Sequence, residues 1–267
     1  MHSLYSPSAI SVSSTIHSEI ILQKAAVLAK NLGLKFVPSL AERSSELILA
    51  YTPEGLQLLR FSLGSSKIVS LLFVDFIHGK NGYRLANDCS TKQPLARAAG
   101  IKPGYRPRVL DCTSGLGGDS FVLASLGCHV TMCERSPIIS ALLADGLDRA
   151  LQETTTAEIV EQRMQLIVDD AQNYLHLNQG HFATIYLDPM YPHRRNSALN
   201  SQAMRTLRTL VGDDQDCGVL LETALTRARN RVVVKRPRSA PTLTKASPSH
   251  VVTMKNSRFD IYLTFNE

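Results

Sequence analysis

A carboxylate, a proline and an aromatic side chain lie close together at the end of an apolar run. The run spans residues 183–187, and Asp188, Pro189 and Tyr191 follow it. An aromatic amine is a poor nucleophile because its lone pair is delocalised into the ring, so two acceptors for its N–H groups favour a pyramidal, reactive nitrogen. The Asp188 side chain and the Pro189 carbonyl can be these acceptors, and Tyr191 can stack on a base. The stretch therefore predicts a site that binds and activates an exocyclic amine.

A glycine-rich stretch forms a second candidate site. A β-type run ends at Asp111, and Gly115, Gly117 and Gly118 follow before the apolar residues 121–124, which have helical spacing. This layout is typical of a nucleotide-cofactor loop between a first parallel strand and a helix. A Cβ atom at Gly115 or Gly117 would block a sharp turn or the close approach of a ligand. The stretch therefore predicts a cofactor site at the start of a helix.

Asp119 indicates which class of cofactor this loop binds. A dinucleotide places its pyrophosphate on the amides at a helix N-terminus, where the helix dipole favours an anion. Asp119 already puts a carboxylate there. S-adenosylmethionine carries a sulfonium and an ammonium, both cations, and fits this loop better. A dinucleotide-dependent oxidoreductase stays open as an alternative, because the glycine loop and Glu134 would also suit it.

Two further predicted strands end in acids. Glu134 comes at the spacing typical of a carboxylate that accepts hydrogen bonds from both ribose hydroxyls. The strand predicted at 166–168 ends beside Asp170, which can accept from an adenine amino group or can be a solvated strand end. If these strands are parallel to those that end at Asp111 and Asp188, all four acids lie at one edge of a sheet. We therefore expect the cofactor along that edge.

The elements that position these residues alternate between strand and helix, which predicts an α/β fold. Apolar runs predict a closing β-hairpin near the C-terminus, at 250–254 and 259–265. Upstream, helical spacing predicts a helix from Ser18 that Gly33 ends, and three β-type runs follow at 47–51, 55–61 and 68–74. Before the helix, the Ser-rich stretch up to about residue 15 predicts a loose tail. We place the N-terminal helix and a small α/β subdomain at residues 1–90 and the cofactor-binding domain at 91–267.

Composition limits the class of protein. With 267 residues, 44% apolar and 19% charged, the chain can bury a sizeable core. No apolar run reaches the roughly 18 residues that cross a bilayer, so we expect a soluble, cytoplasmic protein without a membrane partner. The five cysteines contain no C-x-x-C pair and the eight histidines no H-E-x-x-H pattern, so we expect no metal. The net charge of +6 modestly favours a polyanionic partner.

Several of these motifs together resemble the ribosomal RNA small subunit methyltransferase J family. They are Asp111, Thr113, Gly115–Gly117 and Asp119; Phe121–Ser125; Glu134 and Arg135; Asp188–His193; Ser197–Leu199; Val232–Pro237; and Arg258–Tyr262. The Asp-Pro-Met-Tyr stretch also resembles the Asp-Pro-Pro-Tyr motif of methyltransferases that modify exocyclic amino groups. The resemblance implies a Rossmann-like class I methyltransferase, with a mostly parallel seven-stranded sheet and a C-terminal β-hairpin.

The resemblance also implies a reaction and its site residues. It implies transfer of a methyl group from S-adenosylmethionine to N2 of one guanine in 16S ribosomal RNA, either naked or in the assembled small subunit. The implied cofactor-site residues are Gly118, Asp119, Glu134, Arg135, Asp170, Ala171 and Asp188. Adenine N6 as the acceptor and a non-catalytic RNA-binding module stay open as alternatives.

Basic residues cluster after Asp188 and after the strand predicted near 232–234. They include His193, Arg194, Arg195, Lys235 and Arg236. A phosphate backbone lies where basic groups flank a catalytic strand end. We therefore predict that these five residues contact RNA.

Overall fold

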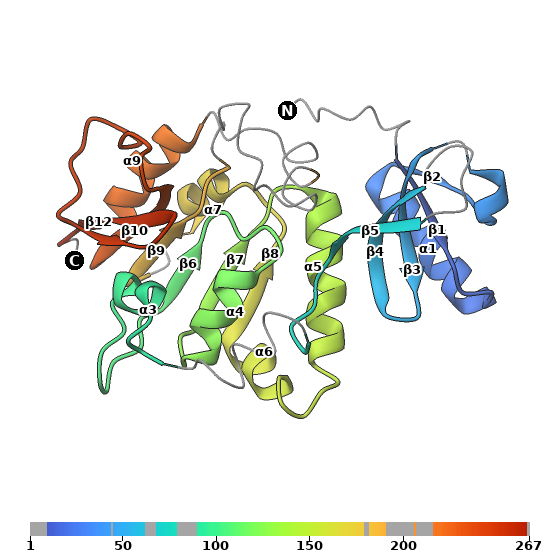
Figure 1. Cartoon of the computed structure of the whole chain (residues 1–267), viewed down its shortest axis with the longest axis horizontal. Helices are drawn as coiled ribbons and strands as arrows, with labels where there is room; N and C mark the ends of the chain where they lie inside the picture. Colours follow the sequence, from blue (N-terminus) through green and yellow to red (C-terminus); the bar gives the residue numbers. More distant parts are fainter. Residues whose placement is uncertain are drawn as a thin grey trace. The chain divides into compact units, whose positions relative to one another are not determined.

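The chain forms two compact units, coloured along the sequence in Figure 1. The computed structural model describes residues 10–43, 45–61, 68–78, 90–178, 182–190, 206 and 216–265. The first unit holds the described residues of Met1–Val74, Ala141–Arg149 and Pro192–Asp213, and the second holds the others. The domain boundary at residue 90 stays a prediction, because 79–89 lies outside the described residues.

A seven-stranded sheet forms the centre of the second unit, in the order β11-β12-β10-β9-β6-β7-β8. The strands are β6 (Val109–Asp111), β7 (Val130–Cys133), β8 (Met164–Ile167), β9 (Thr184–Leu187), β10 (Arg231–Pro237), β11 (His250–Thr253) and β12 (Ser257–Leu263). Strands β6 to β10 pair in parallel, whereas β12 pairs antiparallel with β10 and β11. The predicted mostly parallel sheet with a C-terminal hairpin is confirmed.

Helices cover both faces of this sheet (Figure 1). The described helices that lie wholly in this unit are α3 (Pro94–Ala99), α4 (Gly118–Ser125), α6 (Ala157–Arg163), α7 (Ala171–Leu177) and α9 (Cys217–Arg227). Helix α5 (Pro137–Ala150) begins in this unit, and its residues Ala141–Arg149 belong to the first unit. Helices α7 and α9 pack against one face, where Ile185 and Leu187 are buried. Side chains alternate along a strand, so Thr184 and Tyr186 point to the other face. There Thr184 Oγ1 donates to the Ala99 carbonyl of α3 at 2.8 Å.

A five-stranded sheet in the order β2-β1-β3-β4-β5 forms the first unit. Its elements are β1 (Ile10–Ser14), α1 (Glu19–Leu32), β2 (Lys35–Phe36), the 3-10 helix η2 (Leu40–Glu42), β3 (Leu47–Thr52), β4 (Gly55–Phe61) and β5 (Ile68–Phe73). The predicted helix and the three later strands are confirmed. Gly33 ends α1 in the left-handed region, at φ 63°.

Strand β1 corrects the prediction of a loose N-terminal tail. Ile10–Ser14 is buried throughout and pairs in parallel with both β2 and β3. Its serines fit this interior because Ser13 Oγ donates to the Val37 carbonyl at 2.7 Å and Ser14 Oγ to the Ile16 carbonyl at 3.0 Å. Strands are recognised in a sequence by alternating apolar and polar residues. A buried strand with partners from distant segments does not need this alternation, so the sequence did not reveal β1. Residues 1–9 lie outside the described part of the chain.

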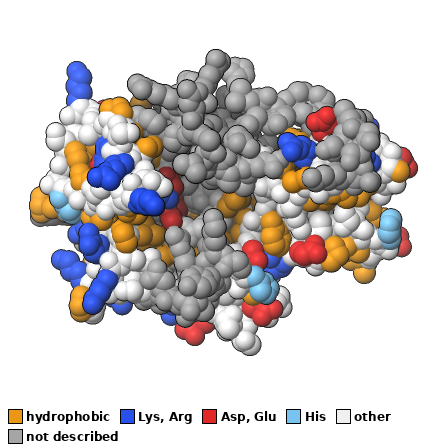
Figure 2. All heavy atoms as spheres, in the orientation of Figure 1, with side chains coloured by type: hydrophobic (Ala, Val, Ile, Leu, Met, Phe, Trp, Pro, Cys, Tyr) orange, Lys and Arg blue, Asp and Glu red, His pale blue; other side chains and the backbone are white. Residues whose placement is uncertain are grey.

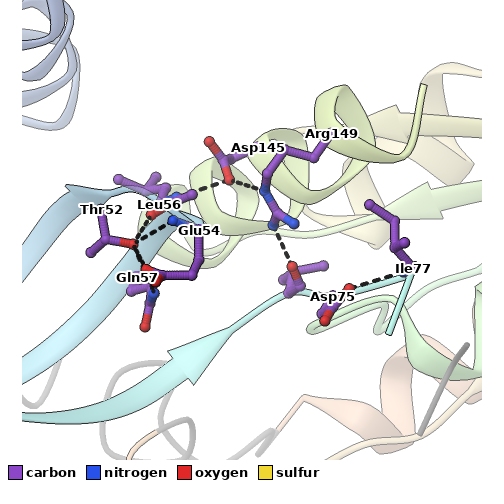
Figure 3. A network of polar contacts seen from close by, with 10 residues as sticks. Thr52, Glu54, Leu56, Gln57, Asp75, Ile77, Asp145 and Arg149 are labelled. Carbon is purple, nitrogen blue, oxygen red and sulfur yellow. Dashed lines mark hydrogen bonds and ion pairs between the residues drawn. The ribbon is translucent and has the colours of Figure 1, made fainter. Parts of the chain in front are cut away.

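Within the first unit, polar contacts connect the second half of α5 to the start of β4 and the end of β5 (Figure 3). Asp145 Oδ2 accepts from the Leu56 amide and from Arg149 Nε, each at 2.9 Å. Arg149 also donates to the Val74 carbonyl, and its guanidinium lies 4.5 Å from the centre of the Phe73 ring. Asp145 and Arg149 therefore join three segments of the first unit.

One local prediction in the second unit needs correction. The third strand of the cofactor-binding domain begins at Met164, before the predicted residue 166. No helix in the described ranges is long and apolar enough to cross a membrane.

Candidate active site

The predicted cofactor loop joins β6 to α4. Gly115 and Gly117 have φ values of 54° and 74°, in the left-handed region that disfavours a Cβ atom. Gly117 is the N-cap of α4, and Gly118 is its first residue. The helix ends in a Schellman motif, in which the Gly127 amide donates to the Ala124 carbonyl at 2.9 Å. The glycine turn is therefore where the sequence predicts it, at the N-terminus of a helix.

Asp111 lies inside this turn. The residue is 2% exposed, and its carboxylate accepts from Ser120 Oγ at 2.5 Å and from the Thr113 amide at 3.0 Å. Burial raises the pKa of the Asp111 carboxyl to about 7, and the bonds from Ser120 and Thr113 only partly offset that effect. In the structure Asp111 holds the shape of the loop; a direct contact with the cofactor stays a prediction.

Glu134 lies beside the same loop, although it follows a different strand. Its Oε2 accepts from the Gly115 amide at 2.9 Å and its Oε1 from the Ser136 amide at 2.7 Å. Ser114 Oγ donates to the Cys133 carbonyl at 2.9 Å and fastens the loop to the end of β7. The structure thus brings together Glu134 and the glycines, as the parallel-strand argument predicts.

Asp170, Ala171 and Arg135 lie at the ends of β7 and β8. Asp170 is the N-cap of α7, where its Oδ1 accepts from the Gln172 amide at 2.8 Å, and Ala171 is the first helical residue. Arg135 Nη1 lies 2.9 Å from Asp216 Oδ2 and 3.5 Å from Asp170 Oδ2. Asp170 is therefore a helix cap and an ion-pair partner, and its contact with an adenine stays a prediction.

Asp188 and Asp119 share one cation. Lys235 Nζ lies 2.8 Å from Asp188 Oδ2 and 2.8 Å from Asp119 Oδ2. The Tyr186 hydroxyl donates to the same Asp119 oxygen at 2.6 Å. The Asp188 amide donates to Thr113 Oγ1 at 2.6 Å. We call Tyr186, Asp119, Lys235 and Asp188 the Lys235 network.

The register of the sheet explains this network. Strands β9 and β10 are parallel neighbours in which Leu187 pairs with Val234, so the next residues, Asp188 and Lys235, lie side by side. The sequence shows an acid after one strand and a lysine after another, but only the strand order makes them partners. Thr113 is a similar case, since it links the cofactor loop to the Asp188 backbone across β6 and β9.

The charges in the network reinforce one another. Burial alone lowers the pKa of Lys235, but Asp188 and Asp119 outweigh it and hold that pKa above its usual value. Burial, followed by the charges of Asp119 and Asp188, raises the pKa of Tyr186 well above its usual value. Lys235 is therefore an ammonium and Tyr186 a neutral donor at neutral pH.

The predicted RNA contacts have different outcomes. Lys235 points to the two carboxylates, and Arg236 is 1% exposed and donates to the Pro241 carbonyl. This burial contradicts the predicted phosphate contact of Arg236, because the side chain faces the interior. Tyr191, His193, Arg194 and Arg195 lie outside the described residues. Pro189 is buried directly after Asp188. Among the residues that the structure describes, no cluster could hold a metal ion.

Comparisons with known proteins agree with this geometry. The family model described as "Putative SAM-dependent methyltransferase" matches residues 28–264. A protein of Desulfotalea psychrophila named ribosomal RNA small subunit methyltransferase J is 50% identical, over 92% of this chain and 95% of its own length. A protein of the same name from Thioalkalivibrio sulfidiphilus is 47% identical, over 92% and 95%. The crystal structure of a SAM-dependent methyltransferase from Neisseria gonorrhoeae is 32% identical and superposes with a TM-score of 0.70, over 97% of both chains.

Proposed function

This chain belongs to the ribosomal RNA small subunit methyltransferase J family of SAM-dependent methyltransferases, and we propose that it methylates the exocyclic N2 of a guanine in small-subunit ribosomal RNA. The observation that carries the proposal is the position of Asp188. It follows β9 at the sheet edge that carries the glycine loop, and its amide is bonded to Thr113 of that loop at 2.6 Å. An acceptor amine bound by Asp188 would therefore lie beside the cofactor.

The residues at this edge suit S-adenosylmethionine. Gly115 and Gly117 leave room for close approach to the backbone, and carboxylates lie at the carboxyl ends of β6, β7 and β9. Asp119 lies in the first turn of α4, where a negative charge suits a cationic ligand better than a pyrophosphate. When bound, the cofactor supplies an activated methyl group. Because the chain belongs to a methyltransferase family, the dinucleotide-dependent oxidoreductase is dropped as an alternative.

Asp188 and Pro189 would position the amine. The Asp188 side chain is 41% exposed, so a ligand can reach it, while Lys235 and the bond from its amide to Thr113 fix its orientation. The carboxylate and the Pro189 carbonyl would accept the two N–H groups of the guanine amine and direct its lone pair toward the methyl group. Positioning would supply most of the acceleration.

The proton released from the nitrogen would leave through Asp188. Methyl transfer forms an N–C bond, breaks the S–C bond and leaves a positive nitrogen that loses one proton. Lys235 cannot take this proton, because its raised pKa keeps it charged. The Asp188 carboxylate is the acceptor in contact with the amine.

Exposed cations near the same edge would meet the RNA. Arg238 follows β10, Lys255 lies in the turn between β11 and β12, and the Arg238 amide donates to the Asn256 carbonyl at 3.2 Å. These groups replace the buried Arg236 as candidate phosphate contacts. A ribosomal RNA substrate also implies a cytoplasmic location.

Methyl transfer from labelled S-adenosylmethionine to small ribosomal subunits that lack this modification tests the proposal. We expect label in N2-methylguanosine after nucleoside analysis. Asp188→Ala should abolish transfer, and Asp188→Asn, which keeps one acceptor oxygen but no charge, should retain a small residual rate. Calorimetry with S-adenosylmethionine should show that both variants still bind the cofactor.

Each other outcome of this experiment has a distinct meaning. Label in N6-methyladenosine would support the adenine alternative and refute the guanine assignment. Cofactor and RNA binding without any label in RNA would favour a non-catalytic RNA-binding module. Full activity of Asp188→Ala would refute the role of Asp188.

A further inference from the structure

A second group of exposed cations lies at the opposite edge of the seven-stranded sheet, before the strands begin. It consists of Arg97, Lys102, Arg106, Arg108 and Arg229, all exposed, and we call it the amino-edge basic surface. In Figure 2, Lys and Arg side chains gather in the lower left, over the region of α3 and the loop that follows it in Figure 1. Neither the cofactor loop nor the Lys235 network uses these residues.

Three neighbouring strands bring this surface together. Strands β6, β9 and β10 lie side by side, so the residues before them are neighbours too. The Arg229 amide donates to the Phe182 carbonyl at 2.9 Å, and the Arg108 guanidinium lies 5.8 Å from the centre of the Phe182 ring. Phe182 therefore connects the cations that precede β6 and β10.

The loop after α3 adds the remaining cations. Tyr105 accepts at its hydroxyl from Asn230 Nδ2 at 3.0 Å, which attaches the loop to the start of β10. Arg106 Nη1 donates to the Lys102 carbonyl at 2.8 Å and Arg106 Nε to the Leu126 carbonyl at 2.5 Å. The loop is thus held in place and presents Lys102 and Tyr105, of which the tyrosine residue is 41% exposed.

Several cations elsewhere in the unit are paired with carboxylates. Arg135, Arg163, Lys235 and Arg258 all form ion pairs with carboxylates. None of the five cations of the amino-edge basic surface forms an ion pair within the described ranges. Residues 90–110 and 223–259, which supply the surface, contain no Asp or Glu. A positive surface with no internal counter-charge attracts a polyanion.

We propose that the amino-edge basic surface binds the phosphate backbone of the RNA substrate. The exposed Tyr105 ring, beside the cations, offers a base a stacking surface, which favours RNA over an acidic protein. The inference rests on the proposed function for the identity of the RNA. Strand β10 has seven residues, so the two sheet edges are about 20 Å apart. The surface would hold the substrate without touching the reacting atoms.

The test removes three charges that have no structural role. The side chains of Arg97, Lys102 and Arg229 form no hydrogen bond or ion pair within the part of the chain described, so Arg97→Gln/Lys102→Gln/Arg229→Gln should fold normally. The matched control, Arg97→Lys/Lys102→Arg/Arg229→Lys, keeps all three charges. Binding of both variants to in vitro transcribed small-subunit ribosomal RNA is measured by filter retention over a series of KCl concentrations, with unfolding midpoints recorded in parallel.

We expect the neutral variant to lose affinity and salt dependence together. Each phosphate contact contributes about 0.7 to the slope of log affinity against log salt, so the slope should decrease by about 2 and the affinity at 0.1 M salt should fall about a hundredfold. The charge-keeping variant should bind like the wild type. In methyl transfer, KM for RNA should rise while kcat and cofactor affinity stay unchanged.

Three results would overturn the proposal. An unchanged affinity and salt slope in the neutral variant would show that the surface does not bind RNA. An equal loss in the charge-keeping variant would show that shape matters and charge does not. Normal binding to free RNA with weakened binding to whole subunits would assign the surface to a ribosomal protein. The binding assay does not depend on methyl transfer. Failure of the proposed reaction would therefore be recognised separately, because the wild type would then bind RNA without methylating it.

Discussion

Substitution of Lys235 by methionine tests whether the network orients Asp188. The change removes the ammonium and keeps an apolar side chain of similar length. Asp119 Oδ2 and Asp188 Oδ2 each lie 2.8 Å from Lys235 Nζ, so the two oxygens are at most twice that distance apart. Without the cation, two negative charges would face each other there.

The size of the effect follows from that separation. Two unit charges about 5.6 Å apart repel by about 3 kcal/mol at an effective dielectric constant of 20 and by about 0.7 kcal/mol in bulk water. Asp119 is 22% exposed and Asp188 is 41% exposed, so water screens part of the repulsion. A loss of about 1–2 kcal/mol in transition-state stabilisation corresponds to a kcat reduced about 5- to 30-fold.

Single-turnover methyl transfer to unmodified small subunits measures this loss. Lys235→Arg, which keeps the charge, is the matched control and should recover much of the rate. KM for RNA should change little in Lys235→Met, because the network orients the reacting carboxylate and does not bind the backbone. An unchanged single-turnover rate in Lys235→Met, or an equal loss in both variants, would refute the reasoning.

The pH dependence of the wild type gives an independent check. The folded-state pKa of Lys235 lies above its ordinary value of 10.5, so its ion pairs are complete below that pH and are lost only as the pH rises through the raised value. The plot of rate against pH should therefore show no change caused by titration of Lys235 between pH 6 and pH 10. A fall in the rate within this range, absent in Lys235→Arg, would contradict the assigned protonation state.

Three further substitutions test the loop and the first unit. Asp111 has a folded-state pKa of about 7 against an ordinary value of 3.8, so its ionisation destabilises the folded protein. This destabilisation is absent below pH 3.8, grows as the pH rises toward 7 and is complete above pH 7. It reaches at most about 4 kcal/mol, and Asp111→Asn should flatten the fall in unfolding free energy between pH 4 and pH 7, measured with urea. Gly117→Ala should destabilise the loop by about 1–2 kcal/mol, because the φ angle of Gly117 is 74°. The same change should weaken the binding of S-adenosylmethionine, measured by calorimetry. Unchanged binding would show that the turn tolerates a Cβ atom. Asp145→Ala removes the acceptor of the Leu56 amide and of Arg149, so the free energy of unfolding in urea should fall by about 2–3 kcal/mol. The folded fraction of this variant should show normal methyl transfer. Wild-type stability in Asp145→Ala would mean that water replaces the carboxylate.

Local signals in the sequence determined much of the fold and the cofactor loop. Gly115 and Gly117 indicate a turn that needs positive φ, and the apolar residues after them indicate a helix; both lie where predicted. Gly33 and Gly100 likewise end their helices in the left-handed region. Such features depend on neighbours in the chain, and their steric cause acts on a few adjacent residues. For that reason they can be read without a structure.

Tertiary structure decided which distant residues became partners. Asp188 and Lys235 meet because β9 and β10 are neighbours with a fixed register, and Arg236, one residue further, points inward and is buried. The Ser-rich segment 10–14 became a buried strand because segments more than twenty residues away supply its hydrogen-bonding partners. Chain-distant contacts of this kind depend on strand order and on which face of a strand is buried. A periodic pattern along one segment carries no information about either, so only the folded sheet assigned Lys235 to the active site and Arg236 to the interior.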